Sequence, residues 1–150
     1  MRRLRLPLVP KPLRWGVVLA VAGTILYYSI LTPPGSGTFR TGPLGLIPFS
    51  DWLHFLAYGG LAATLAYALH DSPRTDRQVL VLVFVVAFGY GAAIELLQAT
   101  IPSRTFDVAD MAVNALGAAI AVGCWRVLSR YARFYRAARP TDLEAPIESP

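Results

Sequence analysis

The segment that decides the fold is residues 95–117, ELLQATIPSRTFDVADMAVNALG, which places ionisable groups beside long apolar runs. It overlaps the end of residues 79–97, a stretch long enough to cross a bilayer that holds twelve Val, Leu, Ile or Phe residues. Each of these favours insertion by about 0.3 to 0.6 kcal/mol, whereas Glu95 costs roughly 3 kcal/mol at most. We therefore expect a transmembrane helix that contains Glu95, with polar groups facing its carboxylate.

The composition indicates an integral membrane protein of one domain. The 150 residues are 55% apolar and 15% charged, with a mean hydropathy of +0.47, which is too apolar for an ordinary soluble domain. The net charge is +5, but the basic residues flank apolar segments, so we expect no nucleic-acid partner. A single cysteine, Cys124, excludes an intrachain disulfide.

Four apolar segments predict an all-α fold, a polytopic membrane protein built as a four-transmembrane-helix bundle. The expected spans are residues 15–31, 52–69, 79–97 and 108–128. The first is long for a signal-peptide core and ends without a small-residue cleavage site, so we expect a span. Residues 1–14 are predicted as a basic cytoplasmic segment, irregular until about Leu13, and residues 129–150 as a basic and then disordered cytoplasmic tail. Within this tail, we expect the fourth helix to continue through residues 129–136 into the headgroup zone.

The basic residues predict the orientation. With the amino terminus inside, the inside segments carry twelve of the 14 Lys and Arg residues, and the outside segments carry only Arg40 and Arg104. Because this is a strong positive-inside signal, we expect both termini in the cytoplasm and a multi-pass protein of the cell membrane.

Polar residues on three of the expected helices repeat at helical spacing and would lie in the outer leaflet. In helix order, they are Asp51, His54 and Tyr58; Glu95 and Gln98; and Asp107, Asp110 and Asn114. At about 1.5 Å per residue, the three stripes overlap in depth and can meet in one cavity. Arg104, on the short turn above, can bridge two carboxylates. These nine residues are the candidate ligand-binding residues.

Several of them also fit purely structural roles. Asp51 and Asp107 each stand where a helix is expected to begin, so either can be an N-cap, with Asp110 at the capping-box offset from Asp107. Three others also have an ordinary alternative: Tyr58 as a buried aromatic with a satisfied hydroxyl, Gln98 as an interfacial polar residue, and Asn114 as an interhelical hydrogen-bonding residue. A functional role is best supported for Glu95 and Asp110, because carboxylates inside a span are by default functional or paired.

Small residues give three of the spans a face on which helix backbones can approach closely. They are Gly59, Gly60, Ala62 and Ala63; Gly89, Gly91, Ala92 and Ala93; and Ala115, Gly117, Ala118 and Ala121. Such faces pack helices and do not by themselves indicate a function.

The ordered motifs resemble those of the VanZ-like family of small integral membrane proteins. They are Asp51-x-x-His54-Phe55-x-x-Tyr58, Glu95-x-x-Gln98, Pro102-x-Arg104, Asp107 and Asp110-x-x-x-Asn114-x-x-Gly117. Trp52, Ser103 and Ala121 stand where family members often have Lys, Gly and Gly. The resemblance implies a small helical bundle, in agreement with a transmembrane domain over residues 15–128. The family is named for a protein associated with low-level teicoplanin resistance, and the resemblance implies no defined biochemical activity.

Three functions fit this constellation. The first is non-enzymatic binding of a lipid headgroup or cell-envelope component in an outer-leaflet pocket, with Arg104 and protonated His54 contacting phosphate or carboxylate. The second is an enzyme acting on such a headgroup, with His54 or Glu95 as the general base, Arg104 as the anion stabiliser and Asp110 orienting the base. A metal-dependent version would use four ligands: Asp51, His54, Glu95 and Asp110. The third is a structural ion-pair network.

The binding function ranks first among these three. The sequence contains neither H-E-x-x-H nor G-x-S-x-G, so the enzyme ranks second. We assign no cofactor and no metal. We expect membrane lipid as the partner, and the sequence leaves oligomerisation open.

Overall fold

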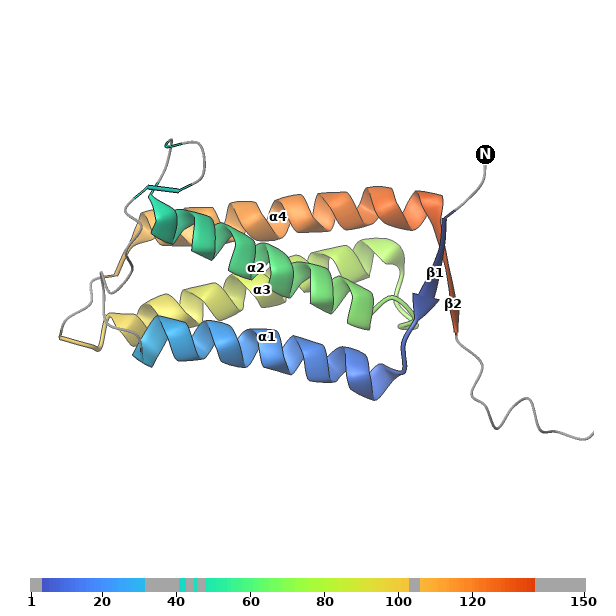
Figure 1. Cartoon of the computed structure of the whole chain (residues 1–150), viewed down its shortest axis with the longest axis horizontal. Coiled ribbons are helices and arrows are strands. Elements are labelled where there is room, and N and C mark those ends of the chain that lie inside the picture. Colours follow the sequence, from blue (N-terminus) through green and yellow to red (C-terminus); the bar gives the residue numbers. More distant parts are fainter. Residues whose placement is uncertain (1–3, 32–40, 43–44, 46–47, 103–105, 137–150) are drawn as a thin grey trace, which may run out of the picture.

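The computed structural model describes residues 4–31, 41–42, 45, 48–102 and 106–136. Arg40, Arg104 and the tail 137–150 lie outside the described residues, so the roles expected for them stay predictions. Within the described residues, the structure is a bundle of four helices: α1 (Lys11–Leu31), α2 (Phe49–Ala68), α3 (Asp76–Gln98) and α4 (Val108–Tyr131). Each helix runs opposite to the one before it (Figure 1). The predicted helical bundle is confirmed.

Three of the four helices, α1, α3 and α4, are long and apolar enough to cross a membrane. Large apolar side chains stand exposed on all three, among them Leu19, Val81 and Leu116, which suits surfaces that face lipid. The second predicted span, α2, falls outside this group because it carries Asp51, His54 and other polar residues. Its 20 residues nevertheless extend about 30 Å, the thickness of the hydrocarbon core.

Asp107 and Asp51 were both possible N-caps, and the residues at which their helices begin show that only one of them is. Asp107 is the N-cap of α4, where its side chain accepts a hydrogen bond from the Ala109 N–H at 2.7 Å. Asp51 is not a cap, because α2 begins one turn earlier, after Pro48. It lies in the first turn and accepts a hydrogen bond from the Ser50 hydroxyl at 2.9 Å. The capping interpretation is therefore confirmed for Asp107 and wrong for Asp51.

The closest helix contact is between α2 and α4, the most extensive helix pair in the bundle. A Cβ atom placed on Gly117 of α4 would meet the Phe55 carbonyl of α2 closer than real Cβ atoms come. A Cβ on Gly59 of α2 would lie 3.3 Å from the Gly117 carbonyl oxygen. The predicted small faces therefore pack here, whereas Gly60 and Gly89 have open space beside them.

Two short strands close the bundle at the end where α1 begins and α4 finishes, which we call the strand end (Figure 1). β1 (Leu4–Leu8) pairs in parallel with β2 (Ala132–Arg136). The expectation of an irregular chain before Leu13 and of a helix continuing to residue 136 was therefore wrong. Both segments alternate between exposed and more buried side chains, as in the exposed Arg133 between Ala132 and Phe134, and this period of two suits a strand. The arginine spacing near residue 130 had suggested a helix instead.

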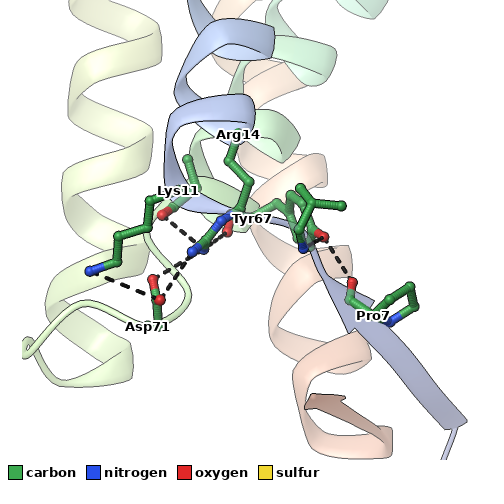
Figure 2. Close-up of polar contacts among 7 residues, drawn as sticks. Pro7, Lys11, Arg14, Tyr67 and Asp71 are labelled. Carbon is green, nitrogen blue, oxygen red and sulfur yellow. Dashed lines mark hydrogen bonds and ion pairs between the residues drawn. The ribbon is translucent and has the colours of Figure 1, made fainter. Parts of the chain in front are cut away.

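Arg14 joins α1 to the end of α2 and to the loop that follows it, although the sequence placed Arg14 only in a basic flank. Its side chain is 2% exposed and binds both carboxylate oxygens of Asp71, at 3.1 and 3.0 Å. It also donates to the carbonyls of Tyr67 and Ala68 at the end of α2, where the helix leaves such acceptors unpaired. The Tyr67 hydroxyl in turn donates to the Pro7 carbonyl at 2.8 Å, which attaches β1 (Figure 2).

His70, in the loop between α2 and α3, packs between elements at the same end. Its ring centroid lies 4.1 Å from that of Phe134 on β2. Burial lowers the pKa of His70 from its ordinary value; nearby Arg14 lowers it further, while Asp71 and Asp76 oppose the shift. The imidazole is therefore neutral at pH 7.

Because of this imidazole, the protein should become less stable as the pH falls below 7. Below about pH 6.5 the unfolded chain takes up a proton at His70, whereas the folded chain does so only at lower pH, so the free energy of unfolding decreases as the pH falls through this window. Replacing His70→Phe keeps the ring contact and removes the titration. We expect a smaller drop in unfolding temperature between pH 7 and pH 5.5 for this variant in detergent. An equal drop in both proteins would contradict the role given to His70.

Candidate functional site

Three helices bring one imidazole and two carboxylates together at the end of the bundle opposite the strands. His54 of α2, Glu95 of α3 and Asp110 of α4 each offer one ligand atom, and these atoms all lie within 4.8 Å of one another. The His54 Nδ1 atom is 3.8 Å from an Asp110 carboxylate oxygen. The separation is too long for a direct hydrogen bond and short enough for a charge interaction. We call these three residues the His-Glu-Asp cluster.

Glu95 is the most buried member of this cluster, with 1% of its surface exposed. Its Oε2 atom lies 3.4 Å from the backbone N–H of Asp107, which donates to it. Its Oε1 atom is buried and has no hydrogen-bond partner within the described residues. Asp107 thus contributes its backbone to the cluster while its side chain caps α4.

Asn114 and Tyr58 lie beside the cluster and deeper in the bundle. Both are nearly fully buried, at 1% and 2% exposure. The Tyr58 ring lies 6.3 Å from the His54 ring, between centroids, and packs against Gly91. Neither amide atom of Asn114 has a hydrogen-bond partner in the part of the chain that the structure describes. The interhelical hydrogen bond considered for Asn114 is therefore not found there.

Two candidates from the sequence make their contacts elsewhere. Gln98 is buried, but its amide donates to the Ser29 carbonyl at 2.9 Å and ties α3 to the end of α1. Asp51 bonds the neighbouring Ser50 at the start of α2. The structure therefore gives both residues structural contacts outside the His-Glu-Asp cluster. Arg104 lies outside the described residues, so its bridge to the carboxylates stays a prediction.

Trp52 is a residue near the site that the sequence pattern did not select. Its indole N–H is buried without a hydrogen-bond partner among the described residues, and its ring closes on Gly42, where a Cβ atom would overlap it. Trp52 also contacts Phe55 edge to face, with ring centroids 6.0 Å apart. Two signals pointed to it: its position between two polar motif residues, Asp51 and His54, and its place where family members often have Lys.

The chemistry of the cluster follows from its charges. Two carboxylates around one imidazole attract a cation or the hydroxyl and amine donors of a neutral group. The same oxygen and nitrogen atoms are suitable ligands for a divalent metal. Because the unpaired Glu95 and Asn114 atoms are buried, a bound group with hydrogen-bond donors would stabilise the site.

Comparison with known proteins assigns the chain to a family. No curated protein and no solved structure gives a match. A family model does: the one for VanZ/LLP1 matches residues 14–129, which include all four helices apart from their outermost residues. This match covers most of the 150 residues and contains every member of the His-Glu-Asp cluster. The chain therefore belongs to the VanZ/LLP1 family.

Proposed function

We propose that this protein crosses the cell membrane four times, with both termini in the cytoplasm, and binds the polar headgroup of a cell-envelope lipid at the His-Glu-Asp cluster. Three long apolar helices support the membrane location, and the length of α2 supports a fourth span. The excess of Lys and Arg on one side supports the orientation. In this arrangement the cluster lies in the outer leaflet, within reach of headgroups.

The unpaired polar atoms beside the cluster are the main support for binding. Glu95 Oε1 and both amide atoms of Asn114 are buried and unpaired within the described residues. Each such atom costs about 1–3 kcal/mol if it stays unpaired. A headgroup that carries hydroxyls or an amine would donate to Glu95 and Asp110 and pair with the Asn114 amide. We include Arg104 in this proposal as a contact for the headgroup phosphate.

Replacing Glu95→Gln should weaken lipid retention roughly 10- to 100-fold, because a hydrogen bond to a charged group contributes about 1.5–3 kcal/mol. The amide keeps the size of the carboxylate but loses its charge. The measurement is the amount of native lipid bound to the protein purified in mild detergent, determined by native mass spectrometry.

Gln98→Leu is the matched control, since Gln98 is buried on the same helix one turn away and bonds α1 instead. We expect this variant to lose about 1 kcal/mol of stability and to retain lipid. If Glu95→Gln lowers the unfolding temperature but leaves lipid retention unchanged, the cluster is a structural ion-pair network and the binding proposal fails.

A metal-dependent enzyme that acts on the same headgroups is the second candidate. It is favoured by one observation, the placement of three ligand atoms from three helices within 4.8 Å of one another. We expect purified protein then to carry one divalent ion per chain, lost in Asp110→Asn, and to convert labelled polar lipids, with no conversion by His54→Ala. Protein without a stoichiometric ion after purification free of chelators would remove this candidate.

A further inference from the structure

A polar cavity lies at the strand end, far from the His-Glu-Asp cluster, between the start of α3 and the end of α4. Its volume is about 570 Å³. Four arginines line it, with a tryptophan and a histidine: Arg74, Arg77, Arg126, Arg130, Trp125 and His70. We call this cavity the arginine cleft. In the sequence analysis, these arginines served only to predict the orientation in the membrane.

Within the described part of the chain, no ion pair neutralises the positive charge of the arginine cleft. None of its four guanidinium groups makes a hydrogen bond or ion pair within the described residues, and Asp76 is the one acid in its lining. The nearby Lys11 and Arg14 differ, because both contact Asp71. His70 is neutral at pH 7, since burial lowers its pKa. The cleft therefore carries a net positive charge that suits an anion.

An apolar groove continues from the arginine cleft along the outer face of α3. Arg74 and Arg77 line both hollows, and the groove, of about 480 Å³, is otherwise lined mainly by aliphatic side chains. Among these, Val81 and Val85 are 57% and 56% exposed, on a helix apolar enough to cross the membrane. A charged cleft joined to an apolar groove matches an amphiphile, which has a polar headgroup and an apolar chain. A free anion would use the cleft but leave the groove empty.

We propose that the arginine cleft binds the phosphate of an anionic phospholipid, with one of its acyl chains in the groove along α3. Arg74 and Arg77 contact the phosphate where cleft and groove meet, and Arg126 and Arg130 face it from α4. Trp125 places its ring at the level of the headgroups, as aromatic residues do at membrane interfaces. This site is independent of the proposed outer-leaflet site, because the two lie at opposite ends of the bundle.

The test is the affinity of the purified full-length protein for phosphatidylglycerol in neutral detergent, measured by native mass spectrometry. Each cation near an anionic lipid contributes about 1 kcal/mol, so Arg74→Gln combined with Arg77→Gln should weaken binding roughly 30-fold. Both side chains are exposed, and their replacement should leave the unfolding temperature of the lipid-free protein unchanged.

Arg5→Gln combined with Arg133→Gln is the control. It removes the same charge from the same end of the molecule, at two paired strand residues that do not line the cleft. We expect affinity within about threefold of the original protein. If both double variants lost the same affinity, general surface charge would explain the effect and the proposal would be overturned. The proposal would also be overturned if phosphatidylcholine with the same acyl chains bound as tightly as phosphatidylglycerol. The same holds if inorganic phosphate bound as tightly as phosphatidylglycerol.

Discussion

Replacing Gly117→Ala should lower the free energy of unfolding by about 3 kcal/mol, the upper end of ordinary overpacking costs. The added methyl group would overlap the Phe55 carbonyl oxygen and lie 3.1 and 3.2 Å from the carbonyl carbon and Cα of that residue. These are backbone atoms of α2, so no side-chain rotation can relieve the overlap. The two helices would have to separate at their closest point. The measurement is unfolding in mixed detergent micelles, followed by helical circular dichroism.

Gly123→Ala on the same helix is the matched control for Gly117. A Cβ atom at Gly123 has open space around it, so alanine should be neutral or stabilise the helix by up to about 1 kcal/mol. If both variants lose the same stability, helix propensity or lipid contact explains the loss, and the close contact between α2 and α4 is not the cause. A large loss for Gly117 alone would support the interhelical contact that α2 and α4 share.

The helices and the cluster could be predicted because their signals are local. An apolar run long enough to cross the membrane needs no knowledge of its neighbours. The spacing between Asp51, His54 and Tyr58 likewise defines one helix face whatever lies opposite. The prediction that His54, Glu95 and Asp110 approach one another needed one further step, the alternation of helix direction, which short connections favour. Their role in binding stays a prediction.

Features that depend on contacts between distant segments could not be predicted in this way. β1 and β2 pair residues 4–8 with 132–136, and the partner that each strand needs lies 128 positions away in the sequence. Gln98 shares a helix face with Glu95, yet its amide reaches α1, because the rotation of α3 between its neighbours decides which side chain faces the site. Arg74 and the other basic residues from which the orientation was predicted gave no sign of a shared cavity.

Arg14 shows the same limit for a single charge. Five basic residues precede the first span, and the sequence treats them as equivalent. Only the packing of α1 against the end of α2 selects one of them for burial beside Asp71. Lys11, one turn earlier, stays 60% exposed and lies 4.0 Å from the same carboxylate. The pair formed by Arg14 and Asp71 therefore allows a prediction that positive-inside reasoning could not make.

Asp71→Ala should lower the free energy of unfolding by about 3–5 kcal/mol, because it leaves the guanidinium of Arg14 buried without its charge partner (Figure 2). Lys11→Gln is the control for charge alone. Its exposed contact with Asp71 should contribute less than about 1 kcal/mol. Both values can be measured by the unfolding assay used for Gly117.

A double-mutant cycle with Arg14→Met separates the ion pair from the other contacts of Arg14. Methionine removes the charge, and it also removes the donors that cap the Tyr67 and Ala68 carbonyls, so Arg14→Met remains destabilising even without Asp71. If the ion pair is strong, the double variant should be about 1–3 kcal/mol more stable than the sum of the single losses implies. A coupling energy below about 0.5 kcal/mol would mean that Asp71 interacts with Arg14 as weakly as an exposed pair does. In that case the two carbonyl contacts, rather than the carboxylate, hold α1 against the end of α2.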